Sequence, residues 1–584
     1  MTLPAVCNGE PLSPAIEVRP GGTAGLVVAS RLSDADPNLS ILVVEGGRNN
    51  YNDPEVLHPI LFPAHVAPTS RRTLFYKGTK EPQLANREMI TPSGGVLGGG
   101  SSINLVTYSR PQREDFEGWK TPGWSADDLI PYYKKFETYH GPGSPETHGD
   151  SGPIHISRGP YAGGLRPEND FIKAAAQLGW PEVTDLMDFD TNNAVYRNLK
   201  FTSPDGRRQD AAHQYLHPRL ADGKHPNLHV LVEHQVIRVL FDGKRAAGVE
   251  FQPNPAHRED VSAGVQHPER SGVGDPAVLA RAGVDVVADV PGVGENYQDH
   301  QLVMYPYKSS LEPSETADAV FGGRVDIPTL LRNNDEILGW NACDVTCKLR
   351  PSDADVAALG PVFQAAWDSD FKDKPNKPLA LFTPINAFTA EPTEMEPAQI
   401  QSLSVFTAYP YSRGHVHITG PQLSDPLDYQ TGYLSDPDGV DIKMSLWAYK
   451  KQREILRRME IYRGEWAPLH PPFPATSAAA SVETSEPLKD VKDIEYTAED
   501  DEIIEKWLRE KVDTTFHSMG TCKMAPRESG GVVDENLSVH ATEILKVADL
   551  SIAPENIAAN TASTAFAIGE KAADIFIKEL GLGQ

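Results

Sequence analysis

The feature that most constrains this chain is a glycine-rich turn between two apolar stretches near its start. Residues 16 to 45 follow the pattern of a strand, a turn, a helix and a second strand, and the turn is Gly21-Gly22-Thr23-Ala24-Gly25. The second stretch, residues 40–45 (SILVVE), is a continuous apolar run, which is typical of a buried parallel strand. This pattern predicts a Rossmann-like α/β unit.

Such a turn is suited to a dinucleotide. Glycines let the backbone approach a pyrophosphate, and the helix that follows offers unpaired N–H groups and the positive end of its dipole. Glu45 lies 20 residues after Gly25, where a carboxylate accepts hydrogen bonds from ribose hydroxyls. We therefore predict a dinucleotide site formed by Gly21, Gly22, Thr23, Ala24, Gly25 and Glu45.

The turn departs from the ideal pattern at one position. Pro20 stands where the first glycine of GxGxxG is expected, and proline fixes φ and lacks an N–H. The preceding strand also carries Glu17 and Arg19, which are unusual in a buried strand. Taken alone, the turn is therefore also compatible with a plain glycine-rich loop that binds no ligand.

Length and charge narrow the function classes. A chain of 584 residues exceeds one ordinary core, so two domains are expected. A net charge of −27, spread along the chain, argues against nucleic acid and anionic membrane surfaces as partners. No apolar run reaches the length of a membrane span, and the first residues lack the features of a secretory signal. We expect an intracellular protein, cytoplasmic or peroxisomal, although the final GLGQ is no Ser-Lys-Leu tripeptide.

Four cysteines are too few for a disulfide framework in a chain of this length: Cys7, Cys343, Cys347 and Cys522. Cys343 and Cys347 would share one face if their segment is helical, but no histidine or further cysteine clusters with them. We expect no metal site.

Further glycine-rich and histidine-containing blocks follow the first turn. They are residues 94–104 (GGVLGGGSSIN), 291–300 (PGVGENYQDH), 516–522 (FHSMGTC), 531–534 (GVVD), 547–552 (VADLSI) and the stretch from Pro554 through Asn560 and Thr561. In this order, they resemble the signature blocks of the glucose–methanol–choline (GMC) family of FAD-dependent oxidoreductases. Residues 371–378, 445–459 and 526–534 resemble, within that family, the fungal short-chain alcohol (methanol) oxidases.

The resemblance implies an α/β (α+β) chain of two domains: a Rossmann-like FAD-binding domain and a substrate domain on a discontinuous antiparallel sheet. It assigns residues 1–155, 206–310 and 498–584 to the FAD-binding domain. It assigns residues 156–205 and 311–497 to the substrate domain, with a Pro/Ala/Ser-rich insertion at 466–495.

The resemblance also implies roles for single residues. Gly21, Gly22 and Gly25 would face the FAD pyrophosphate and Glu45 the adenosine ribose, while the backbone of Val236 would meet adenine. The remaining implied cofactor contacts are Gly100, Ser101, Asn104, Asp549, Leu550 and Thr561. His517 would be the catalytic base that takes the hydroxyl proton, and Asn560 would hold the same oxygen. Phe516, beside the base, would narrow the pocket towards small alcohols, and His300 is expected to be structural.

The implied reaction is the oxidation of a short-chain primary alcohol to the aldehyde. Flavin N5 accepts the hydride, and we expect O2 to reoxidise the flavin and give hydrogen peroxide. The alcohol and O2 are thus the expected partners, and a homo-oligomer is an open expectation because related alcohol oxidases assemble. The sequence leaves open which alcohol is used and whether the enzyme is an oxidase or a dehydrogenase.

Two other functions remain open at this point. Some members of the family keep FAD but cleave cyanohydrins, so a lyase is one alternative. The other is an inactive chain with impaired FAD binding, because Pro20 departs from the pattern and residues 259–274 are visibly shortened against the family. A short replaced or lost segment of the sequence record would produce both departures.

Overall fold

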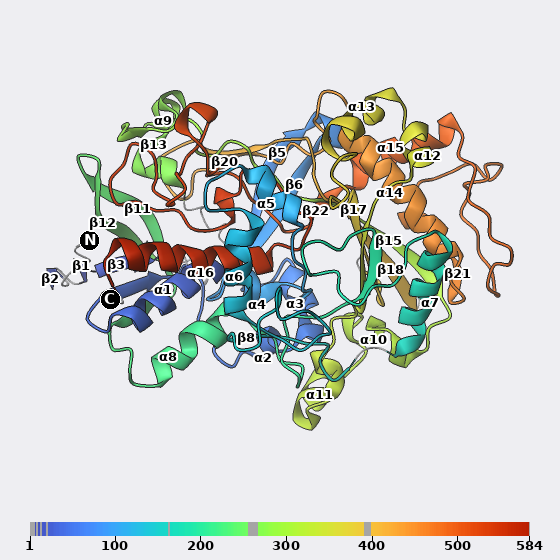
Figure 1. Ribbon diagram of the computed structural model, residues 1–584, viewed down its shortest axis with the longest axis horizontal. Coiled ribbons are helices and arrows are strands. Elements are labelled where there is room, and N and C mark those ends of the chain that lie inside the picture. The colour runs from blue at the N-terminus through green and yellow to red at the C-terminus, as the bar shows by residue number, and fades with distance from the viewer. Residues whose placement is uncertain are drawn as a thin grey trace.

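The computed structural model describes residues 6–7, 10–11, 15–18, 21–161, 164–254, 267–389 and 399–582. Pro20 and residues 259–266 lie outside these ranges. From the shortened stretch the structure describes the 3-10 helix η5 (Pro268–Ser271) and the strand β13 (Val273–Gly274). Two lobes lie along the long axis of the molecule, and both chain termini belong to one of them (Figure 1).

The lobe with the termini is built on a parallel sheet. Within the described residues, three strands pair in the order β10-β4-β3, namely β3 (Ala15–Val18), β4 (Ser40–Val44) and β10 (Leu228–Leu231). Both pairings are parallel, and helix α1 (Thr23–Ala35) connects β3 to β4. The predicted strand–turn–helix–strand unit is therefore confirmed, and with it the Rossmann-like α/β class.

The last helix of the chain packs on the first one. Helix α16 (Ala562–Glu579) lies along α1, as Figure 1 shows. Gly569 permits this close approach, because a Cβ atom there would lie 2.9 Å from Val27 Cβ and 3.0 Å from Ala24 Cα. On the same face, the buried Glu570 carboxylate accepts hydrogen bonds of 2.7 Å from Arg31 and from Tyr215.

The second lobe contains an antiparallel sheet whose strands are not in the order of the sequence. Within the described part of the chain, six strands follow the order β21-β15-β18-β17-β16-β9, and a seventh, β22, also pairs with β15. Every pairing in this sheet is antiparallel, which confirms the predicted substrate-domain architecture. The strands are β9 (Ala194–Arg197), β15 (Gln301–Ser309), β16 (Val345–Leu349), β17 (Ala380–Ile385), β18 (Ile400–Thr407), β21 (Tyr462–Glu465) and β22 (Asp513–Thr514).

Two features of the antiparallel sheet bear on the sequence analysis. Cys347 lies in strand β16, so Cys343 and Cys347 do not share a helix face. The strand assignment follows from pairing with β17 and β9, which no local pattern reveals. Strand β15 lies in the antiparallel sheet although residues 301–310 were assigned to the FAD-binding domain. We therefore propose that this domain boundary falls near residue 300.

Helix α14 (Val440–Arg457) covers one face of the antiparallel sheet and is buried along most of its length. It contains most of residues 445–459, one of the stretches that resemble the short-chain alcohol oxidases. The Pro/Ala/Ser-rich insertion at 466–495 folds over this helix, and the Arg453 guanidinium donates a 2.8 Å hydrogen bond to the Ala479 carbonyl. Within this insertion the structure has the single helical turn η9 (Ala467–Leu469) and otherwise loop.

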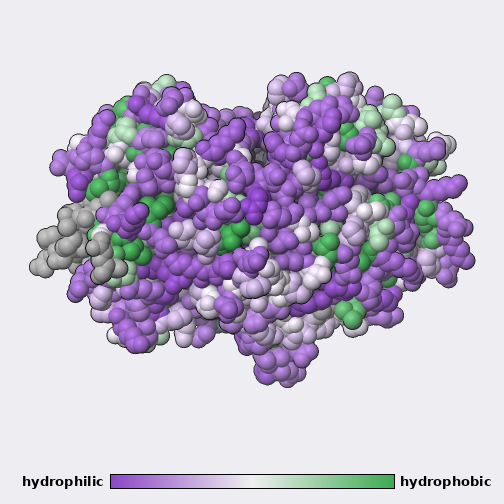
Figure 2. Space-filling model, viewed as in Figure 1, coloured by the Kyte–Doolittle hydropathy of each residue, from purple (hydrophilic) through white to green (hydrophobic). Residues whose placement is uncertain are grey.

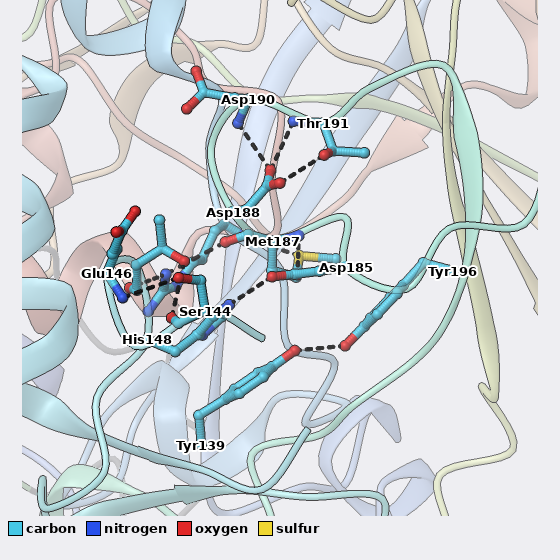
Figure 3. A network of polar contacts seen from close by, with 12 residues as sticks. Tyr139, Ser144, Glu146, His148, Asp185, Met187, Asp188, Asp190, Thr191 and Tyr196 are labelled. Atoms are coloured by element: carbon cyan, nitrogen blue, oxygen red, sulfur yellow. Dashed lines mark hydrogen bonds and ion pairs between the residues drawn. The ribbon is translucent and has the colours of Figure 1, made fainter. Parts of the chain in front are cut away.

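A polar network surrounds His148 and Tyr139 (Figure 3). His148 contacts Glu137 and Asp185 through its two ring nitrogens, each at 3.0 Å. The Tyr139 ring stacks on His148, and the Tyr139 hydroxyl lies 2.7 Å from that of Tyr196 in β9. The network thus connects strand β7 (Glu137–Tyr139) to the edge of the antiparallel sheet.

The face of the molecule in Figure 2 is mostly hydrophilic, with apolar residues scattered over it, and its outline is indented between the two lobes. This agrees with the strongly negative net charge of the chain. None of the described helices combines the length and the apolar character of a bilayer span.

The Glu570 contacts predict a large stability effect. We expect Glu570→Leu to lower the free energy of unfolding by about 3 kcal/mol, because it leaves Arg31 and Tyr215 without their buried acceptor. Chemical denaturation of the holoenzyme measures the change. Glu460→Gln is the matched control: it breaks an exposed ion pair with Lys173 and should leave the transition nearly unchanged. Equal shifts in both variants would contradict this account.

A second ionic cluster holds the segment that carries the PGVGEN residues. His417, in strand β19 (His415–Ile418), donates to Glu269 at 2.7 Å and to Glu295 at 3.0 Å. Burial alone lowers the pKa of His417, but these two carboxylates outweigh it and raise the pKa to about 9. The imidazolium therefore links β19 to η5 and to the loop before residue 300.

This cluster makes stability depend on pH in the alkaline range. Because the folded-state pKa of His417 lies above its ordinary value of 6.5, its stabilisation is complete below that pH and is lost as pH rises through about 9. We expect His417→Gln to be clearly less stable than the wild type at pH 6, with the gap closing by pH 10. Thermal unfolding across this range tests it, and a gap that does not change with pH would refute it.

Candidate active site

A cavity of about 1630 Å³ extends from the parallel-sheet lobe to the antiparallel sheet. Every residue predicted for the site lines it except Gly21. These residues are Gly22, Thr23, Ala24, Gly25, Glu45, Gly100, Ser101, Asn104, Val236, Phe516, His517, Asp549, Leu550, Asn560 and Thr561. Segments that are distant in sequence thus meet around one elongated space.

Glycines form part of the cavity wall. A Cβ atom built on Gly22 or on Gly100 would meet no atom within 4 Å, so both backbones face open space. Gly99 has a φ of +55°, and a Cβ atom there would lie 2.8 Å from Gly22 Cα. These two glycine segments therefore pack backbone against backbone and leave a smooth wall, which is what a pyrophosphate or a flat ring requires.

Gly21 has a different place from the one that the sequence predicts. It packs behind the wall, where a Cβ atom would come within 2.8 Å of the Leu97 side chain and 3.1 Å of Glu45 Cβ. Its carbonyl accepts a 2.7 Å hydrogen bond from the Gly98 N–H. The glycine at this position is thus required for packing between the turn and the second glycine segment.

Two long helices begin at the cavity. Gly22 is the N-cap of α1 and Thr561 is the N-cap of α16, and neither receives a side-chain cap. Thr23, Ala24 and Ala562, in the first turns of these helices, line the cavity. Unpaired N–H groups and positive dipole ends therefore favour negative charge at two separate points of the cavity.

Glu45 lies at the end of the cavity in the parallel-sheet lobe and is buried. Burial raises the pKa of its carboxyl to about 7, although the backbone N–H groups of Gly47 and Gly21 act in the opposite direction. The Gly47 N–H donates to Glu45 Oε1 at 2.6 Å. The carboxylate also lines the cavity, so it can accept a hydroxyl of a ligand.

His517 and Asn560 come together at the other end of the cavity. The Asn560 side-chain amide lies 3.4 Å from His517 Nε2, and both side chains line the cavity. The His517 backbone N–H donates to the buried Asp299 carboxylate at 3.1 Å. Burial lowers the pKa of His517 well below its ordinary value, and the neighbouring His300 lowers it further. The ring is therefore neutral at physiological pH and holds a lone pair for a proton.

His300 stands behind His517 and does not line the cavity. The Nδ1 atoms of the two rings lie 2.8 Å apart, and His300 Nε2 lies 2.8 Å from the carbonyl oxygen of Ile557. His300 is completely buried, and burial lowers its pKa to about 4 despite the contact with Ile557. Both histidines are thus neutral and directly coupled.

Phe516 has the most unusual backbone at this end of the cavity. Its φ is +63°, in the left-handed region that a bulky aromatic residue rarely adopts, and 44% of its surface is exposed. Its N–H donates to the Thr514 hydroxyl at 2.8 Å. The strained turn directs the backbone so that Phe516 and His517 both border the cavity.

The sequence analysis missed the wall that the antiparallel sheet provides. Strands β15, β17 and β18 each contribute side chains to it, and the segment before the second glycine block contributes two more. These residues are Leu302, Met304, Thr383, Ile385, Ser404, Phe406, Tyr76 and Thr91. The strands read as apolar runs in the sequence, and only their pairing shows which side chains point inward.

Family models of GMC oxidoreductases match residues 18–302 and residues 410–569. The chain belongs to the GMC oxidoreductase family. This GMC oxidoreductase is 35% identical to the alcohol oxidase of Candida boidinii, over 96% of this chain and 94% of that protein. It is 34% identical to alcohol oxidase 1 of Komagataella phaffii, over the same shares.

Solved structures share the fold. An FAD-dependent oxidoreductase from Chaetomium thermophilum superposes with a TM-score of 0.78 at 25% identity, covering 97% of this GMC oxidoreductase and all of that chain. The formate oxidase of Aspergillus oryzae superposes with a TM-score of 0.79 at 21% identity, covering 97% and 98% of the two chains, and shows the fold alone. FAD is the cofactor of the family, and the glycine-lined wall and the two helix N-termini fit an elongated, negatively charged dinucleotide.

The contact between the two glycine segments predicts that a side chain added there weakens FAD binding. We expect Gly99→Ala to weaken FAD binding at least about tenfold, because the methyl group meets Gly22 Cα in a backbone conformation that already disfavours it. Flavin absorbance per polypeptide in the purified protein measures the loss. Gly123→Ala is the matched control, since it has a φ of +77° but open space around its Cβ. If both variants retain FAD equally, the contact has no such role.

Proposed function

We propose that this GMC oxidoreductase catalyses the FAD-dependent oxidation of a short-chain primary alcohol to the aldehyde. The alcohol oxidases to which it is similar over almost its whole length support alcohol as the donor. The pair of His517 and Asn560 at one end of the cavity is the observation that carries the proposal, because a base and a hydrogen-bonding amide converge there on one small space.

FAD would lie along the cavity with its adenosine near Glu45 and Val236. The first turn of α1 would bind the pyrophosphate, with Gly22 allowing close approach and Asp549 and Leu550 bordering the opposite wall. Gly100, Ser101 and Asn104 would lie along the flavin, and the N-terminus of α16 at Thr561 would stabilise negative charge at the pyrimidine end of the ring. When bound, FAD supplies the acceptor of the carbinol hydride at its N5 atom.

His517 would accept the hydroxyl proton of the alcohol at Nε2. Its low pKa keeps it neutral, so no proton has to leave the ring before the reaction starts. Asn560 would hold the substrate oxygen beside Nε2 and so fix the direction of the proton transfer. The protonated His517 would then provide a positive charge next to the site where O2 is reduced to hydrogen peroxide.

Phe516 would limit the size of the alcohol. Its exposed ring borders the cavity directly beside the base, and its strained backbone leaves it little freedom to move away. A small primary alcohol fits next to such a ring, whereas a bulky secondary alcohol would have to displace it. Leu302 and Phe406, which are paired across the neighbouring strands β15 and β18, add apolar surface to the cavity.

The test is the absorption spectrum of the purified holoenzyme under anaerobic conditions, before and after addition of methanol or ethanol. We expect the flavin bands to bleach, and His517→Asn to slow the bleaching by about 10²- to 10⁴-fold, the range that a general base contributes. Hydrogen peroxide after admission of air distinguishes an oxidase from a dehydrogenase.

Other outcomes would overturn the proposal. Flavin bands that no primary alcohol bleaches would favour the lyase, which uses FAD without redox chemistry. A purified protein without flavin would favour the inactive chain. If the flavin bands of His517→Asn bleach at the wild-type rate, His517 is not the base.

A further inference from the structure

We infer that His300 is a positioning residue that holds the base His517 in a single tautomer, with the proton on Nδ1 and the lone pair of Nε2 directed at the substrate. This inference rests on the proposed function, because it concerns how the proposed base is prepared. His300 itself does not border the cavity, so it acts on the reaction only through His517.

The contact with Ile557 fixes the protonation of His300. A carbonyl oxygen accepts hydrogen bonds and has no hydrogen to donate, so the nitrogen 2.8 Å from it must carry a proton. His300 Nε2 is that nitrogen. Because burial keeps the ring neutral, its second nitrogen, Nδ1, has no proton and presents a lone pair.

The contact between the two rings then fixes His517. The two Nδ1 atoms lie 2.8 Å apart, and one of them must donate to the other. His300 Nδ1 can only accept, so His517 Nδ1 carries the proton and donates it. In the neutral ring of His517 the remaining nitrogen, Nε2, is therefore the free base. It is the nitrogen that lies beside the Asn560 amide.

The Ala408 backbone, like that of Ile557, also forms a hydrogen bond with His300 that raises its pKa, but burial outweighs both contacts. The Phe406 ring packs against both histidines, with ring centres 4.8 Å from that of His300 and 5.7 Å from that of His517. Both histidines are buried, so water does not replace either contact. The two rings stand at 90° to each other, and a rotation of His517 by half a turn about its Cβ–Cγ bond would place a C–H group against His300 Nδ1.

The position of His300 is itself determined by the loop that carries Asn560. Asn296 and Gln298 both donate to the Pro554 carbonyl, at 3.2 Å and 3.1 Å, and His300 reaches Ile557 on the same loop. Asn296, Gln298 and His300 thus hold one loop at two of its carbonyls, those of Pro554 and Ile557. The base and Asn560 are consequently aligned by the same contacts, which explains why the QDH stretch lies so close to the site.

The experiment uses two variants of His300 in the holoenzyme. His300→Leu fills the space but offers no acceptor to His517, and we expect it to slow flavin reduction by the alcohol about 10²-fold or more. His300→Asn keeps a carbonyl oxygen close to the position of Nδ1, and we expect it to recover most of the lost rate. His140→Leu removes an exposed histidine and serves as the control for the substitution itself.

A second measurement does not depend on activity. Nitrogen-15 NMR of the histidine-labelled wild-type holoenzyme, with the signal of His517 identified by its loss in His517→Asn, should show a protonated Nδ1 and an unprotonated Nε2. In His300→Leu the proton should be found on Nε2 in a substantial share of the molecules.

Each outcome has one meaning. A wild-type His517 with its proton on Nε2 would overturn the inference, as would equal losses of rate in the Leu and Asn variants. If the tautomer is as inferred but alcohols do not reduce the wild-type flavin, the proposed function fails while the positioning contact stands.

Discussion

The site depends on a contact between two stretches of backbone that have no side chains. The Gly98 N–H donates to the Gly21 carbonyl, and Gly99 lies against Gly22 at a distance that excludes even a methyl group. This contact brings the first turn of the Rossmann-like unit against the second glycine segment and so creates the wall of the cavity. The N-terminus of α1, the start of the segment 100–104 and the base at the far end are all placed relative to this wall.

The same residue type performs opposite electrostatic tasks in different parts of the molecule. His417 lies between two carboxylates, which outweigh burial and keep it charged. His517 is buried against another histidine and an aromatic ring, so burial dominates and the ring is neutral. A charged histidine stabilises the packing of a strand, whereas a neutral one retains the lone pair that a proton transfer requires. The neighbouring groups, and not the position in the sequence, decide whether a histidine is charged or neutral.

Local patterns in the sequence were sufficient where the chemistry is local. The turn at 21–25 and the strand 40–44 could be predicted because spacing and residue type define them, whereas the role expected of His517 came from the resemblance to the GMC family. The packing of Gly21 behind the wall could not be predicted because its partner, Leu97, is more than seventy residues away. The strands that contain residues 301–309 and Cys347 could not be predicted for the same reason, since pairing with remote strands determines both. The coupling of His300 to His517 joins residues 217 positions apart, so no window of sequence contains it.

The packing of α16 on α1 has a consequence for the biogenesis of the protein. The helix that begins the cofactor-binding unit is covered by the helix that ends the chain, and the Arg31–Glu570 contact joins residues 539 positions apart. At the usual rates of synthesis the ribosome needs roughly half a minute to two minutes to reach α16. During that time the face of α1 that α16 covers has no partner in the chain, although β4 and other elements that pack on α1 are already made. A product that ends before α16 would therefore leave this apolar face exposed.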